Sequence, residues 1–231
     1  MNGDNGALWD AATLILPLVF AIVCHEIAHG LVARWLGDPT AARMGRLTLN
    51  PLAHVDPVGT VVVPGLLALA HAPVFGWARP VPVDARFFRD PRRGMMLVGI
   101  AGPAMNFVLA LVAAVGIGLM ARFVPQPEPR SLAAFTADNL ANFLAVNLFI
   151  GLFNLLPVPP FDGSHVVEGL LPLPLARRYA RARRWGMLLA IGLVVVVPWF
   201  TGASVVARWV EPPFTWLYAH YLALAQWVAG A

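Results

Sequence analysis

Two histidines and a glutamate lie close together near the start of the chain, in the sequence His25-Glu26-Ile27-Ala28-His29. On a helix, a spacing of four residues places both imidazoles on one face, about 6 Å apart, where they can share one metal ion. Glu26 follows the first histidine directly and is free to accept a proton. This order of residues is the pattern by which a helix binds zinc in hydrolytic sites. We therefore predict His25 and His29 as metal ligands and Glu26 as a general base.

The same residues follow a strongly apolar run. Residues 11–23 carry no charged side chain, which is typical of a membrane-spanning helix. Ionisable groups at bilayer depth are energetically costly, so they are assigned a function and a partner by default. The partner predicted here is a divalent metal ion. The alternative interpretation is a polar patch that lines a helix interface.

A third candidate ligand follows another apolar stretch, in the sequence NLLPVPPFDG at residues 154–163. Pro157 and Pro160 end a helix, and Gly163 permits a tight turn. Irregular backbone at membrane depth is tolerated only where it is buried in protein or lines a watery cavity. A broken helix that presents Asp162 therefore predicts this carboxylate as the third metal ligand. The alternative is that Asp162 caps the helix that follows.

Two histidines and one carboxylate leave a fourth position on zinc open, as in hydrolytic rather than structural sites. Zinc lowers the pKa of a bound water toward about 7, so that Glu26 can take its proton during attack on a peptide carbonyl. Glu26 can then pass the proton to the leaving amine. Asn154 is a further candidate catalytic residue, because its amide could donate to the developing oxyanion or hold Asp162 in place. Helix packing is the other interpretation of Asn154.

Taken together, the two motifs resemble those of the site-2 protease family of intramembrane zinc metalloproteases. The family's patterns fall on His25, Glu26 and His29 and on Asn154, Pro157, Asp162 and Gly163. Three further stretches, LNPLAHVDPVGT, FGWARPVPVD and AGPAMNF, are similar to compact bacterial and archaeal members, so the resemblance covers about residues 20–170. It implies a three-helix core that holds one zinc ion and cleaves the transmembrane segment of a substrate near the cytoplasmic side.

The composition is typical of a polytopic membrane protein. Hydrophobic residues make up 59% of the chain and charged residues only 12%, whereas soluble domains are nearer a quarter charged. All 16 basic residues are arginines, in a few clusters that do not form a nucleic-acid-binding face, so no nucleic-acid partner is expected. A single cysteine, Cys24, excludes an intrachain disulfide. The N-terminal residues lack the positive charge of a signal peptide, so the first apolar segment is predicted to stay as a transmembrane helix.

We predict an all-α membrane protein with one domain over residues 1–231, a core at about 8–170 and extra spans at about 185–230. The apolar segments of spanning length lie at residues 11–33, 95–121, 139–156 and 185–207, with a further candidate at 213–230.

Two shorter segments follow the first predicted span. Residues 58–70 are apolar but number only 13 and are interrupted by Pro64 and Gly65, which favours a re-entrant segment over a full crossing. Residues 45–50 alternate between polar and apolar side chains, the pattern of a short strand. An irregular loop is the alternative for this second segment.

Arginine placement predicts the orientation. If residues 58–70 do not cross, 13 arginines fall on one side, and Arg122, Arg130 and Arg208 fall on the other. By the positive-inside rule the larger set is cytoplasmic. The N-terminus is then outside, and the active site lies near the cytoplasmic side. The resemblance implies a bacterial or archaeal cell membrane.

The predicted partners are the lipid bilayer and a membrane protein substrate with a single span. Because a helix hides its carbonyls, the substrate must unwind, and residues 45–50 are predicted to receive it by strand addition. No segment fits the PDZ or CBS modules of larger family members, so any regulation through such modules is expected to come from a separate membrane protein. The arginines at residues 177–184 are predicted to lie next to anionic headgroups. The sequence leaves the oligomeric state open.

Three other polar side chains receive mainly structural interpretations. His54 is predicted in a turn or as a partner of a metal ligand, and His165 at the surface or at the membrane interface. Asn106 is a weaker candidate for the role considered for Asn154, with helix packing as the favoured interpretation. Two other functions are compatible with the composition of the site. A metal-ion transporter also places ionisable groups within helices, and a non-catalytic relative retains the fold without turnover. The order of ligand, base and ligand favours an active protease.

Overall fold

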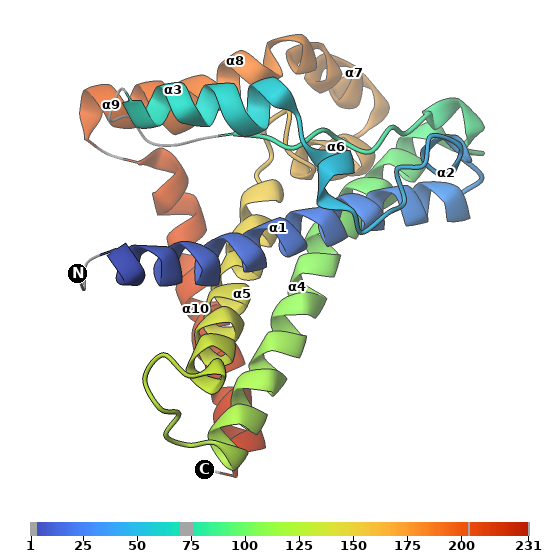
Figure 1. Cartoon of the computed structure of the whole chain (residues 1–231). Coiled ribbons are helices and arrows are strands. Elements are labelled where there is room, and N and C mark those ends of the chain that lie inside the picture. Colours follow the sequence, from blue (N-terminus) through green and yellow to red (C-terminus); the bar gives the residue numbers. More distant parts are fainter. Residues whose placement is uncertain (1–3, 70–75, 203, 231) are drawn as a thin grey trace.

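Helices form all the regular structure in the described part of the chain, which in this computed structural model comprises residues 4–69, 76–202 and 204–230. The long helices are α1 (Asp4–Trp35), α4 (Pro91–Phe123), α5 (Leu132–Asn154) and α10 (Val205–Ala229). In Figure 1, α4, α5 and α10 run together through the lower half of the molecule, and α1 crosses them. The predicted all-α class is therefore confirmed.

Three of the long helices begin at residues that suit a first turn. Asp90 accepts hydrogen bonds from backbone N–H groups in the first turn of α4, and Pro91 is the first residue of that helix. Ser131 and Ser204 accept similar bonds at the starts of α5 and α10. The helix starts are therefore fixed by local sequence.

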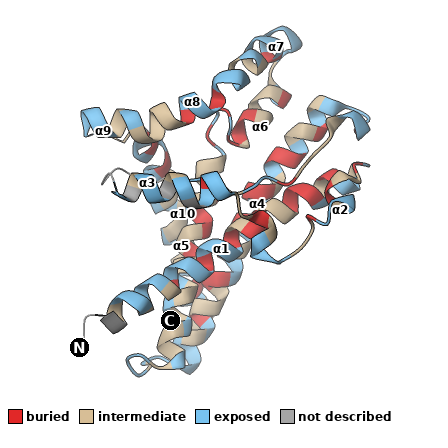
Figure 2. Ribbon diagram, turned by 45° about the horizontal axis from the view of Figure 1, so that its top comes forward, coloured by how far each residue is buried: buried red, intermediate tan, exposed pale blue. Residues whose placement is uncertain are grey.

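Small residues hold the long helices together. Ala110, Ala113 and Ala114 of α4 are fully buried against Leu144 and Leu148 of α5. Small side chains let helix backbones approach closely, which is how membrane helices gain packing energy. Aromatic residues of α10 pack against the same cluster. Figure 2 shows that buried residues also gather where α1 crosses α4.

Contacts near the ends of the long helices show in which direction each helix runs. Gly116 near the end of α4 lies beside Leu140 near the start of α5, so these two helices are antiparallel. Trp9 near the start of α1 donates a hydrogen bond of 2.8 Å to Asp138, which is also near the start of α5. The start of α1, the end of α4 and the start of α5 therefore lie together.

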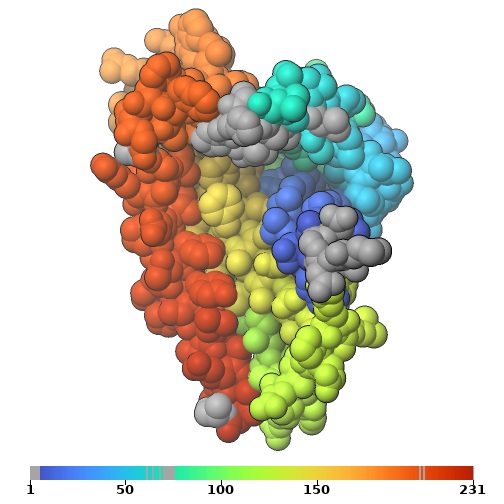
Figure 3. Space-filling model, turned by 60° about the vertical axis from the view of Figure 1, so that its left-hand side comes forward, coloured from blue at the N-terminus to red at the C-terminus, as the bar shows by residue number. Residues whose placement is uncertain are grey.

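Helix α10 runs in the same direction as α4. Tyr221 donates a hydrogen bond of 3.2 Å to the carbonyl of Phe107, and the later residue Val228 lies beside the later residue Gly118. The end of α10 therefore lies with the end of α4. Its start lies at the opposite end of the molecule, with the end of α5. Figure 3 shows α10 along one side of the molecule, in red, over its full length.

Short helices follow α5 at that opposite end: α6 (Gly163–Leu170), α7 (Leu173–Ala182), α8 (Gly186–Ile191) and α9 (Val197–Thr201). Ala190 of α8 packs with Leu156 and Phe161, just after α5, and with Val206 at the start of α10. The chain thus leaves the end of α5 and returns to it before α10 begins. Figure 1 shows α7, α8 and α9 along the upper edge, across the direction of α10.

Four helices of the described residues are long and apolar enough to cross a membrane: Gly6–Trp35, Pro91–Phe123, Leu132–Asn154 and Leu173–Thr201. The first three coincide with predicted spans. The predicted span 185–207 is wrong at its end, because the helix stops before Gly202, which has a φ of 65°, and α10 starts at Val205. The apolar character continues through this break, so hydropathy alone joins two helices. The candidate segment 213–230 belongs to α10 and its C-cap.

The segment predicted to be re-entrant forms a short helix. A π-helical turn, Pro57–Val62, leads directly into α3 (Val63–Leu69), and Ala70 lies outside the described residues. At about 1.5 Å per residue, this helix is too short to cross a bilayer by itself. Its insertion into the membrane stays a prediction.

The short strand expected at residues 45–50 is not present. This segment follows the short helix α2 (Thr40–Arg43) and has no regular structure. Its polar groups bond locally: the Thr48 carbonyl lies 2.9 Å from His54 Nε2, and Asn50 caps a 3₁₀ turn at Pro51–His54. These contacts replace the ladder that a strand would need, and the alternation of side chains misled the strand prediction.

Candidate metal centre

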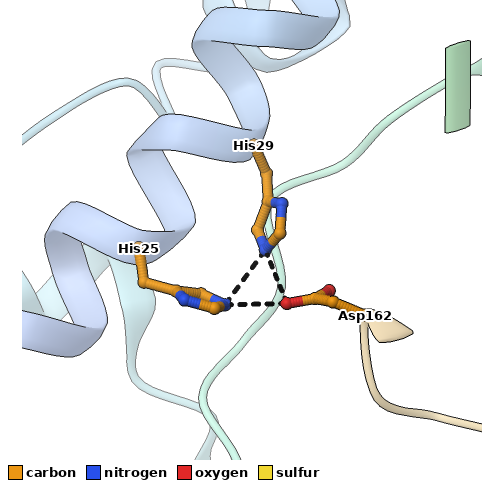
Figure 4. A group of neighbouring side chains, drawn as sticks. All are labelled: His25, His29 and Asp162. Atoms are coloured by element: carbon orange, nitrogen blue, oxygen red, sulfur yellow. Dashed lines mark hydrogen bonds and ion pairs between the residues drawn. The ribbon is translucent and has the colours of Figure 1, made fainter. Parts of the chain in front are cut away.

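His25, His29 and Asp162 meet where α1 passes the start of α6 (Figure 4). The two Nε2 atoms are 3.0 Å apart, and Asp162 Oδ2 lies 3.1 Å from that of His25 and 3.3 Å from that of His29. The histidines are buried, and the side chain of Asp162 is 18% exposed. Residues separated by more than a hundred positions thus present three ligand atoms to one point.

Local sequence explains how Asp162 reaches this point. Helix α5 ends at Asn154, and a proline-rich turn leads to α6, which starts at Gly163 directly after Asp162. A Cβ atom at Gly163 would collide with the carbonyl oxygens of Leu155 and Leu156, so the turn requires glycine here. The start of α6 therefore packs tightly on the end of α5 and directs the carboxylate toward α1.

The three ligand atoms fit a zinc ion. A tetrahedral ion with bonds of about 2.0–2.1 Å places its ligands about 3.3 Å apart, close to the separations observed here. Asp162 Oδ2 is buried and receives no hydrogen bond of regular geometry. Such a buried, unsatisfied oxygen is costly unless a cation is bound to it.

Gly102 of α4 supplies the space for such an ion. A Cβ atom at this position would lie 2.5 Å from His29 Nε2 and 2.6 Å from His25 Nε2. The side of α4 that faces the two ligand nitrogens is therefore open only because the residue is glycine.

In both histidines, the ring nitrogen that faces away from the other ligands, Nδ1, has a hydrogen-bond partner. His29 Nδ1 lies 2.7 Å from the carbonyl oxygen of Val98, which can only accept, so Nδ1 carries a proton and Nε2 is the nitrogen left to bind a metal. His25 Nδ1 lies 2.6 Å from Asn106 Oδ1. Each ligand histidine thus has a partner that orients its ring, as is usual for histidines that bind a metal.

Glu26 lies next to the ligands but is not among them. Its Oε2 accepts a hydrogen bond of 2.8 Å from the backbone N–H of Val81. Val81 belongs to an irregular segment before α4 and is buried against Gly30 of α1. The carboxylate of Glu26 is therefore held in place by a part of the chain outside its own helix.

The structure places the remaining candidates elsewhere. Asn154 donates 3.0 Å to the carbonyl of Ile150 in its own helix, and no described hydrogen bond joins it to Asp162. His54 is buried in its turn, as predicted. His165 is half-buried in the first turn of α6, and its Nδ1 lies 3.4 Å from the guanidinium of Arg183. Its pKa is lowered by burial first and by the charge of Arg183 second.

Sequence reasoning missed other residues that touch the site. Three of them are Gly102, Val98 and Val81. They contribute space or backbone groups to the site, and a pattern of side-chain types in the sequence cannot reveal such contributions. Asn147 is fully buried and bonds to Asn106. Its only signal in the sequence is an amide within an apolar helix.

A helix of membrane-spanning length that carries two histidine ligands and a glutamate, with an aspartate brought beside them, defines the class of membrane metallopeptidases. Comparison with known proteins agrees. The profile of Peptidase family M50 matches residues 123–198. YwhC of Bacillus subtilis is 40% identical over 186 residues, which cover 79% of this chain and 80% of YwhC. The chain belongs to peptidase family M50, which confirms the resemblance to site-2 proteases.

Two mycobacterial relatives are also similar. Rip2 of Mycolicibacterium smegmatis is 31% identical over 84% of this chain and 76% of its own length. Rip2 of Mycobacterium tuberculosis is 28% identical over 87% of this chain and 80% of its own length. The names of YwhC and both Rip2 proteins describe them provisionally as zinc metalloproteases. No solved structure matches the chain significantly.

Proposed function

We propose that this chain is a zinc metalloendopeptidase that hydrolyses a peptide bond in or near the transmembrane segment of a membrane protein. The observation that carries the proposal is the meeting of His25, His29 and Asp162 at the separations of a zinc site, on a helix apolar enough to span a bilayer. The relatives' names support zinc as the metal. A site built into a membrane helix favours a substrate that is itself in the membrane.

The residues of the site have different roles in this proposal. His25, His29 and Asp162 would hold the ion, and zinc when bound supplies a Lewis acid that polarises a carbonyl and lowers the pKa of water. Glu26 accepts a proton from the attacking water and delivers it to the leaving nitrogen. Asn154 stays a candidate for steadying the oxyanion, which requires its amide to leave the Ile150 carbonyl.

The helix ends support a cytoplasmic site. Of the 16 arginines, all within the described residues, only Arg122 and Arg130 lie at the end of the molecule where α4 finishes and α5 begins. Arg208, predicted on the same side as these two, lies instead in the first turn of α10 at the opposite end. The positive-inside rule then makes the opposite end cytoplasmic and the N-terminus external. His29 precedes Arg34, at the cytoplasmic end of α1, by about 8 Å along the helix. A shallow opening would bring water to the metal.

Docking of the substrate at residues 45–50 by strand addition stays a prediction. The Thr48 carbonyl that an added strand would use is already close to His54 Nε2. Strand addition at this segment therefore requires that contact to open first.

The proposed function is tested on the full chain, purified in detergent, by counting bound zinc and following cleavage of a single-span substrate. We expect one zinc per chain and cleavage by the wild type. Glu26→Gln retains zinc and loses at least about a hundredfold in rate, because the base is gone but the ligands remain. Asp162→Ala loses both zinc and cleavage.

Glu211→Gln is the matched control, since Glu211 is an exposed carboxylate on α10, away from the metal ligands. It should leave both zinc content and cleavage unchanged. The proposal would be contradicted if the folded wild-type protein bound no stoichiometric zinc. Full cleavage by Glu26→Gln would remove Glu26 from the role of base.

A further inference from the structure

A line of hydrogen bonds leads away from His25 into the helix bundle. Its Nδ1 lies 2.6 Å from Asn106 Oδ1 on α4. Asn106 Nδ2 donates 2.8 Å to Asn147 Oδ1 on α5, and Asn147 Nδ2 donates 2.8 Å to the carbonyl of Phe143. Both asparagines are fully buried, with 0% of their surface exposed. The line therefore joins α5, α4 and α1 away from water.

Two backbone carbonyl oxygens fix the direction of the bonds in this line: that of Phe143 accepts from Asn147 Nδ2, and that of Ala21 lies 3.5 Å from Asn106 Nδ2. A backbone carbonyl can only accept, so Asn147 must turn its NH₂ group toward Phe143. The side-chain oxygen of Asn147 then faces Asn106, so Asn106 must donate from its own NH₂ group. The oxygen of Asn106 is thereby left facing His25. Flipping either amide would oppose two acceptors or two donors inside the bundle.

This direction determines the state of His25. Because Asn106 presents an acceptor, the imidazole must donate from Nδ1, and Nε2 is the nitrogen left to bind a metal. That Nε2 is the atom which faces Asp162 and His29. His29 reaches the same state through the carbonyl of Val98. A neutral imidazole with a free Nε2 is the form that binds a metal.

We propose that Asn106 and Asn147 are positioning residues of the metal centre. Neither touches the reacting atoms; together they fix the tautomer and ring orientation of His25, Asn106 directly and Asn147 through Asn106. The inference rests on the proposed function in that His25 must be a metal ligand. It replaces the interpretation of Asn106 as a helix-packing residue.

Helix packing alone makes a different prediction about substitutions. Buried amides between membrane helices also contribute to helix association, so loss of stability by itself cannot separate the two roles. The two roles are separated by the zinc affinities of the variants, and by which substitution at one position retains the higher affinity. A residue that only packs tolerates leucine better than a carboxylate, whereas a residue that accepts the Nδ1 proton tolerates the carboxylate better.

The experiment measures zinc affinity of the purified full chain by competition with a chelator, and the visible absorption of the cobalt-substituted protein. Asn106→Leu and Asn147→Leu are expected to weaken zinc binding roughly ten- to hundredfold, the usual effect of removing a partner of a metal-bound histidine. Asn106→Asp is expected to retain more zinc affinity than Asn106→Leu, because its carboxylate still accepts from His25 although it no longer donates to Asn147. Wild-type affinity and an unchanged cobalt spectrum in both leucine variants would overturn the proposal.

Asn142 provides a matched control on the same helix. Its amide also bonds from α5 to α1, 2.9 Å from the carbonyl of Thr13, but it does not reach a histidine. Asn142→Leu should therefore leave zinc affinity and the cobalt spectrum unchanged. A loss as large as that of Asn147→Leu would show that any amide between these helices has the same effect, and would also overturn the proposal.

Nitrogen-15 NMR of the zinc-loaded wild type, labelled in histidine, decides the question without variants that could misfold. Both ligand histidines should carry a proton on Nδ1 and bind through Nε2, and binding of His25 through Nδ1 would contradict the line of bonds. Failure of the metal centre itself is distinguishable, because the wild type would then bind no zinc. Failure of the positioning role leaves wild-type zinc and cleavage intact.

Discussion

Gly102 lies so close to the two ligand histidines that a side chain at this position would enter the metal site. Replacing it with alanine puts a methyl group about 2.5 Å from the ligand nitrogens of both histidines, inside the volume that an ion would fill. We expect Gly102→Ala to lose zinc affinity by roughly tenfold to a hundredfold, and cleavage with it. Zinc content and chelator competition of the folded variant measure this.

Gly192→Ala is the control for that substitution, since a Cβ atom there meets nothing within 4 Å. It should bind zinc as the wild type does. Retention of full zinc affinity by Gly102→Ala would place the ion away from the face of α4 and would contradict the geometry of the site.

Much of the site is predictable at the level of single residues, because ligands must be of particular types. Two histidines four residues apart, and a carboxylate after a helix break, are enough to identify His25, His29 and Asp162 from the order of residues alone. Asn147 is not predictable in this way. Helix α5 also carries Asn139 and Asn142, and only the crossing of the helices decides which amide reaches a histidine through α4.

At the scale of elements, length and hydropathy identify most helices but not which of them cross the membrane. The segment Leu173–Thr201 is as apolar as a span, yet its residue Ala190 packs with the end of α5 and with the start of α10. A single crossing would separate those two ends by about 30 Å. We therefore expect α7 to α9 to stay on one side. Helix α10 falls outside the four apolar candidates but lies beside α4 along its length, so we expect it to cross together with α1, α4 and α5.

Reporter fusions test this arrangement in cells. A reporter joined after Gly202 should read the cytoplasm, and one joined after Ala231 should read the outside, as should one joined before Met1. Green fluorescent protein and alkaline phosphatase report the two sides in opposite ways. The reverse pattern for the two later positions would mean that Leu173–Thr201 crosses, and would contradict the packing around Ala190.

The whole molecule is joined at its metal centre, because ligands from α1 and from the turn between α5 and α6 would share one ion. A bound ion stabilises the folded chain by about 2.7 kcal/mol when it is present at a hundred times its Kd. Removal of zinc with a chelator should therefore lower Tm by roughly 5–10 °C. Thermal unfolding in detergent measures the change.

The Asp162→Ala variant is the reference for that measurement, since it lacks a ligand and should unfold at the same temperature with or without chelator. An equal fall in Tm for this variant would show that the chelator acts elsewhere. An unchanged Tm of the zinc-loaded wild type would mean that the ion does not link the two parts of the fold.

Metal retention and turnover are two properties of an enzyme that are usually lost together, and the contact between Glu26 and Val81 separates them. Val81 stands between Pro80 and Pro82, and prolines have no N–H, so it is the one residue of this triplet able to donate to the carboxylate. The prolines also keep the segment extended and stiff. If Glu26 is the base, as proposed, alterations to this stiff segment would misplace its carboxylate while the ion stays bound, so that metal retention and turnover would be controlled from different stretches of the polypeptide.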